Sequence, residues 1–152
     1  GMQPLFGQAY GAKKDDDLKY YYRVGQMISV IGSVLCVAVY VLFPHVLCQL
    51  FGATGETLEF TSAHMWEYCW GFIVGSVNTM LSAYFYSTKR SGQAIALNIV
   101  RSLVLNSLVI TVLPKIFGNA VVWHTFGIYE VLVLIIALVL KRVSEKRGII
   151  YR

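Results

Sequence analysis

The sequence predicts an all-α polytopic membrane protein, a helical bundle of four transmembrane helices with the end of a fifth. Hydrophobic residues make up 57% of the chain and charged residues only 14%, whereas soluble domains usually hold about 25% charged residues. Four runs of 21 residues or more also carry one charge or none. Since about 20 helical residues cross a hydrocarbon core of about 30 Å, each run is long enough to span a bilayer. The expected surroundings of the chain are therefore lipid.

The four apolar runs are expected to form helices over 26–51, 65–88, 94–114 and 119–141, and residues 1–12 to form the end of an earlier helix. The runs themselves cover 24–55 and 68–88, which contain no charged residue, 91–114, which contains Arg101, and 116–140, which contains Glu130. Continuous stretches such as "LVLIIALVL" favour helices, because the strands of membrane barrels alternate polar and apolar residues.

Short connections are expected between these helices, at 52–64, 87–93 and 114–119. In the last of them, Pro114 and Gly118 are expected to break the chain. Asp15, Asp16 and Asp17 suit a helix N-terminus, where the helix dipole favours negative charge. The first helix is therefore expected to start along the membrane surface before it enters the bilayer.

Lysine and arginine residues are strongly asymmetric across the predicted topology. Lys115 lies on one side and Arg101 lies within a helix. The opposite side holds eleven: Lys13, Lys14, Lys19, Arg23, Lys89, Arg90, Lys141, Arg142, Lys146, Arg147 and Arg152. The positive-inside rule then places both ends of the chain in the cytoplasm, in a multi-pass protein of the cell membrane with a cytoplasmic tail at 142–152. These charges flank apolar runs and form no single stripe, so a nucleic-acid partner is not expected.

Two charges inside predicted helices are the first candidates for function, because intramembrane charges are costly and usually meet a partner or a wet cavity. Arg101 and Glu130 are expected at depths that differ by about 6 Å, which an arginine side chain can reach across. In one interpretation Glu130 binds a proton or cation and Arg101 tunes it. In the other, the two form a structural pair, or Arg101 extends to the headgroups. Asn98, Asn106 and Asn78 add polar stripes that line a cavity or bind a neighbouring helix.

Three histidines and an acid form a second candidate set at the opposite end of the helices. They are His45, His64, Glu67 and His124. Such side chains can bind zinc if they meet, and the alternative is interfacial residues with no common site. The sequence contains no phosphate-binding loop, Ser–His–Asp order or paired acids, so neither an enzyme nor a bound cofactor is expected. Gly71 and Gly75 form a GxxxG motif, which predicts close helix packing.

The first residues, "GMQPLFGQAYGAKK", resemble a signature of the multidrug and toxic compound extrusion (MATE) transporters. In that family a proline-containing helix ends in a Gly-Gln-Pro-Leu…Gly-Ala pattern before a charged cytoplasmic loop. The matching residues are Gly1, Gln3, Pro4, Leu5, Gly11 and Ala12. Further similar stretches follow in the family's order: "LFPHVLCQLFG", "YFYSTKRSGQAIALNIVRSLVL" and "LPKIFGNAVVWHTFGIYEVL". The resemblance therefore covers nearly the whole chain.

The resemblance implies a transporter of twelve helices in two six-helix lobes. Residues 1–152 would be part of the C-terminal lobe: the end of helix eight, helices nine to twelve and the tail. It implies export of small organic cations by antiport with sodium or protons, and as partners the bilayer and the N-terminal lobe. Arg101 and Glu130 match positions where the family often has such residues. One branch of the family has a cation-binding acid in helix ten, but residues 68–88 contain none and Glu67 lies at their outer end.

Three alternatives to an exporter remain open from the sequence. One is a lipid-linked saccharide flippase of the same superfamily. Another is a membrane metal-binding protein or enzyme that uses the three histidines and Glu67. The last is a small membrane subunit with no role in transport.

Overall fold

The computed structural model describes residues 1–146, with side chains described for residues 1–143. All its regular elements in that range are helical, which confirms the all-α prediction. In chain order they are α1 (Gln3–Gly11), α2 (Asp15–Leu42), α3 (Pro44–Leu50), α4 (Gly55–Ser87), α5 (Ser91–Ile99), the π-helical segment η1 (Val100–Leu105), α6 (Asn106–Phe117), the 3₁₀ helix η2 (Asn119–His124) and α7 (Thr125–Lys146).

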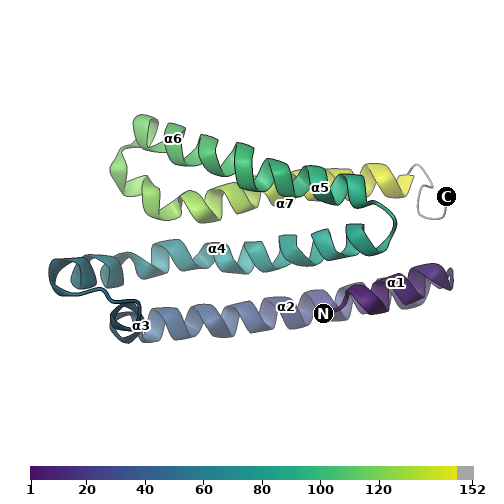
Figure 1. Cartoon of the computed structure of the whole chain (residues 1–152), viewed down its shortest axis with the longest axis horizontal. Helices are drawn as coiled ribbons and strands as arrows, with labels where there is room; N and C mark the ends of the chain where they lie inside the picture. Colours follow the sequence, from purple (N-terminus) through teal and green to yellow (C-terminus); the bar gives the residue numbers. More distant parts are fainter. Residues whose placement is uncertain (147–152) are drawn as a thin grey trace.

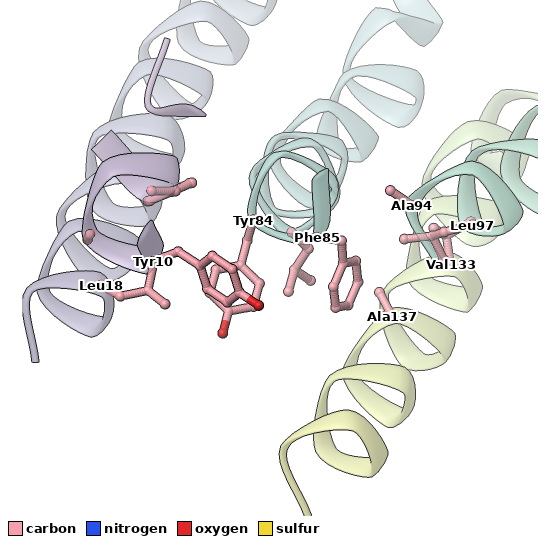
Figure 2. Packing of buried hydrophobic residues seen from close by; sticks show 11 residues of the cluster. Tyr10, Leu18, Tyr84, Phe85, Ala94, Leu97, Val133 and Ala137 are labelled. Atoms are coloured by element: carbon pink, nitrogen blue, oxygen red, sulfur yellow. The ribbon is translucent and has the colours of Figure 1, made fainter. Parts of the chain in front are cut away.

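The long helices run alongside one another, and α4 lies in the middle (Figure 1). On one side α4 packs against α2, with α1 beside them, and on the other it packs against α7. The hydrophobic core gathers where these layers meet (Figure 2). Tyr84 and Phe85 of α4 lie between residues of α1 and α2 and residues of α5 and α7, which include Tyr10, Leu18, Ala94, Leu97, Val133 and Ala137. The central helix therefore joins both halves of the bundle.

The first long helix begins where the three aspartates predict a helix N-terminus, but it ends earlier than the span expected over 26–51. α2 begins at Asp15, with three aspartates in its first turn, where negative charge favours a helix. It stops at Leu42, and α3 starts at Pro44. Pro44 lacks an N–H and disfavours the helical conformation at the preceding Phe43, whose φ and ψ are −126° and 46°. The single helix expected over 26–51 is therefore wrong, because the proline divides it into two.

The other helices are longer than expected. The connection placed at 52–64 is mostly helical, because α4 already starts at Gly55, and the connection placed at 87–93 shortens to residues 88–90. Pro114 lies inside α6 and does not end it. Gly118 ends that helix, with a φ of +86° that glycine adopts readily.

The last predicted helix, 119–141, starts as the 3₁₀ helix η2 and continues through α7 to Lys146. The tail expected at 142–152 is thus helical up to residue 146. Its remainder, with Arg147 and Arg152, lies outside the described residues, as does the side chain of Lys146.

Two helical segments of the described chain are long and apolar enough to cross a membrane, Asp15–Leu42 and Ser91–Phe117. Only 6% and 11% of their most apolar windows are buried inside the protein. On α2, the side chains of Ile28, Leu35 and Leu42 are 63%, 63% and 70% exposed. Contiguous apolar surface of this kind is unusual on soluble proteins, and it agrees with lipid as the surrounding solvent.

Close packing between α4 and α7 depends on two glycines that face one another. A Cβ added at Gly71 would overlap the ring of Phe126 and lie 2.8 Å from the backbone nitrogen of Gly127. A Cβ added at Gly127 would in turn overlap the ring of Trp70. The close packing expected at the GxxxG motif is therefore present at Gly71. At Gly75 the nearest atoms would be 3.5 Å away, an ordinary contact.

We expect Gly71→Ala to lower the thermal unfolding midpoint of the detergent-solubilised protein. The added methyl group meets backbone of α7, and overpacking of this kind typically costs about 1–3 kcal/mol. Gly32→Ala is the matched control, because nothing lies within 4 Å of a Cβ at Gly32 and alanine favours helix over glycine. An equal or smaller loss of stability in Gly71→Ala than in Gly32→Ala would contradict this packing.

Candidate functional site

The two intramembrane charges of the sequence form an ion pair inside the bundle. Glu130 lies on α7, and its side chain is fully buried. The Nε and Nη2 atoms of Arg101, from η1, donate hydrogen bonds to its Oε1 over 2.8 and 2.5 Å. The Arg101 side chain remains 24% exposed. The pair is therefore asymmetric: the acid is enclosed, and the base extends from it toward the surface.

Asn78 of α4 completes the surroundings of the carboxylate. Its Nδ2 donates to Oε2 of Glu130 over 2.7 Å and to the Glu130 backbone carbonyl over 2.8 Å. Asn78 is itself 1% exposed, and its Oδ1 is buried with no hydrogen-bond partner. Three segments of the chain thus meet at one carboxylate, and an acceptor oxygen without a donor lies beside it. Buried polar groups normally have partners, and among the described residues this oxygen has none.

The backbone around this cluster accommodates the charged groups. A Cβ at Gly75 would lie 3.5 Å from Nη2 of Arg101 and from Cδ of Glu130, so the ion pair lies against the bare backbone of α4. Arg101 itself is in the π-helical segment Val100–Leu105. Such segments are rare and often occur at functional sites.

The polar residues expected to form a stripe along the third helix have different surroundings. Asn98 donates to the Tyr86 hydroxyl over 3.2 Å, Arg101 pairs with Glu130, and Asn106 is half-buried. Five residues were candidates for function inside the helices: Arg101, Glu130, Asn78, Asn98 and Asn106. The structure brings together the first three of them.

The four residues considered for zinc do not gather in one site. Nε2 of His124 lies 3.5 Å from Oε2 of Glu67, but the other two histidines have different neighbours. His45 Nε2 is 3.3 Å from the Ser62 hydroxyl, and His64 Nδ1 is 2.9 Å from the carbonyl oxygen of Phe60. Residues 1–143 contain no group of three or more His, Cys, Asp or Glu that could hold a metal ion. The zinc interpretation is therefore wrong in its geometry, because each histidine is held by its own local contacts.

The signature residues Gln3, Pro4 and Gly11 near the start of the chain are exposed, and one of them contacts α4 through its backbone. Gln3 and Pro4 form the first turn of α1, where a proline is tolerated because its missing N–H has no helical partner. The Ser87 hydroxyl of α4 donates to the Gln3 carbonyl over 3.1 Å. Gly11 is the last residue of α1. The start of α1 therefore lies beside the end of α4.

The surroundings of two cationic side chains, Lys141 and Arg90, were not predicted from the sequence. Nζ of Lys141 lies 3.9 Å from the ring centre of Tyr22 and 5.2 Å from that of Tyr84, a cation–π contact that joins α7 to α2 and α4. Arg90 is 5% exposed, and its guanidinium nitrogens have no hydrogen-bond partner. The run of tyrosines at 20–22 hints at the first contact, because aromatic residues gather at membrane interfaces.

Exposed apolar helices around a buried ion pair define an integral membrane bundle with a charged site between its helices. The MatE family model matches residues 1–112 of this chain. The chain therefore belongs to the MatE family of membrane transporters, which confirms the resemblance carried by its motifs. Asn78 and Arg101 lie within the matched stretch, and Glu130 lies beyond it. No protein of curated function and no solved structure matches the chain.

We expect Arg101→Ala to destabilise the protein by about 3–5 kcal/mol, because it leaves the buried charge of Glu130 without a partner. Adding Glu130→Gln to Arg101→Ala removes that charge, so most of the loss is expected to be recovered. Denaturation midpoints of the two single variants, the double variant and the wild type measure this coupling. Losses that simply add in the double variant would show that the two side chains do not depend on each other.

Proposed function

We propose that this chain is the C-terminal-lobe part of a secondary active transporter that exports organic cations by antiport with sodium or protons. The observation that carries the proposal is the enclosed Glu130 carboxylate, held by Arg101 and Asn78 in a member of the MatE family. Buried acids in membrane transporters commonly serve as proton or ion sites. The proposal gives the carboxylate this coupling role.

The charge of the cluster supports an exchange mechanism. While Arg101 is bound, its positive charge balances the carboxylate, so no further cation is needed. If Arg101 moves toward the surface to which it is already 24% exposed, Glu130 becomes an unpaired buried charge, which is strongly unfavourable. A proton on the carboxylate, or a sodium ion held by Oε2 of Glu130 and Oδ1 of Asn78, would restore neutrality. Arg101 and the coupling ion would thus occupy the acid alternately.

We further propose that α2, α4, the α5–α6 segment and α7 each cross the cell membrane, as the last four helices of a twelve-helix protein. The start of α2, the α4–α5 connection and the end of α7 lie at the same end of the bundle (Figure 1). The lysines and arginines that flank the helices are concentrated there, and this supports a cytoplasmic position for that end. Alternating access would require the other lobe as a partner.

In the full-length transporter we expect Glu130→Gln to reduce resistance to cationic drugs by tenfold or more, since the neutral amide cannot exchange Arg101 for a coupling ion. Glu59→Gln is the control, because Glu59 is an exposed acid of the same helix bundle. Growth on the drugs at equal expression, and uptake into proteoliposomes with an imposed sodium or proton gradient, measure the effect.

Unchanged resistance in Glu130→Gln would leave the ion pair as a structural element and overturn the coupling role. The uptake assay also distinguishes the flippase alternative. Translocation of a lipid-linked saccharide, without transport of any organic cation, would favour the flippase.

A further inference from the structure

A groove of about 630 Å³ runs along the outer face of α2. Its lining includes Lys19, Arg23, Gln26, Val30 and Ile31. Lys19, Arg23, Gln26 and Val30 are spaced by three or four residues, so they form one stripe along the helix, and Ile31 adjoins it. Because the groove lies on α2, it is separate from the ion pair of α4, η1 and α7.

The groove changes from charged to apolar along its length. At one end Lys19 and Arg23 are exposed, and neither has an ion-pair partner among the side chains of residues 1–143. At the other end Met27, Val30 and Ile31 form an apolar surface. From Arg23 to Ile31 the helix rises about 12 Å, close to the thickness of one hydrocarbon leaflet, about 15 Å.

Gln26 lies between these two ends. Its amide nitrogen and oxygen are both buried and have no hydrogen-bond partner. Beside it, the Tyr22 ring lies 3.9 Å from the ammonium group of Lys141, which adds positive charge near the basic end. The groove therefore offers cations at one end and an apolar surface at the other, with Gln26 between them.

We propose that this groove binds an anionic phospholipid of the cytoplasmic leaflet. The phosphate lies between Lys19 and Arg23, the glycerol region passes over Gln26, and an acyl chain follows Met27, Val30 and Ile31. A headgroup with net negative charge is favoured, because Lys19 and Arg23 bring two positive charges and each is worth about 1 kcal/mol toward an anionic surface, or about a fivefold change in affinity.

Charge complementarity favours this occupant over a covering protein helix. A helix laid on the groove would need carboxylates at the height of Lys19 and Arg23, a partner for Gln26 and an apolar face below them. A single phospholipid supplies the same order of groups and is present at high concentration. The proposal depends on the insertion of α2 into the membrane and does not depend on export.

The test uses the full-length protein, purified and exposed to dioleoyl phosphatidylglycerol or dioleoyl phosphatidylcholine, with bound lipids counted by native mass spectrometry. The substitutions Lys19→Gln and Arg23→Gln each remove one positive charge. Each is expected to weaken phosphatidylglycerol binding about fivefold. Ile31→Trp, which fills the apolar end, is expected to weaken it without changing charge. The control pair Lys89→Gln and Arg142→Gln removes two exposed cations outside the groove and is expected to leave binding unchanged.

Several outcomes would overturn the proposal. Equal retention by the wild type and the Lys19/Arg23 double variant would show that another part of the protein covers the groove. An equal loss in the control pair would show a general effect of surface charge, and equal retention of phosphatidylcholine would remove the preference for anions. Replacement of phosphatidylglycerol by an isoprenoid diphosphate would make the groove a substrate site. Glu130→Gln is expected to retain lipid as the wild type does, so failure of export and failure of lipid binding are separable.

Discussion

The charge of Glu130 is the constraint on which this bundle depends. A carboxylate enclosed by protein must be neutralised and hydrogen-bonded, and residues from three segments meet that need. Arg101 supplies the opposite charge, and Asn78 supplies a hydrogen-bond donor. Gly75 has no side chain, so the ion pair can lie against the backbone of α4. Because these groups come from α4, η1 and α7, any change at the carboxylate acts on the packing of all three.

In the rest of the chain, many large apolar side chains face outward instead of being buried in a protein core. Its buried cluster lies on two sides of α4, against α1 and the start of α2 and against α5 and α7 (Figure 2). Farther along, α2 presents large apolar side chains outward. The cation–π contact of Lys141 with Tyr22 and Tyr84 ties α7 to the other helices at that end. The groove along α2 continues this arrangement, with cations at the membrane edge and apolar side chains deeper.

Much of this arrangement was predictable, because hydropathy and charge report directly on the solvent around a helix. The all-helical class, the family and the meeting of Arg101 with Glu130 follow from apolar runs, ordered motifs and the cost of intramembrane charge. Helix ends were less predictable: Pro44 divides a span, while Pro114 does not end one. The π-helical turn at Arg101 and the separate contacts of the histidines depend on tertiary packing, which spacing in the sequence does not report.

The most direct test of the central claim is the infrared absorption of the Glu130 carboxylate in the full-length transporter. Difference spectra would be recorded on addition of sodium and on lowering the pH, with Glu130→Gln to assign the band. An exchange of Arg101 for a coupling ion predicts a change in this band under one of the two conditions, absent from Glu130→Gln. A carboxylate band that is the same under all conditions would show a permanent structural ion pair and contradict the claim.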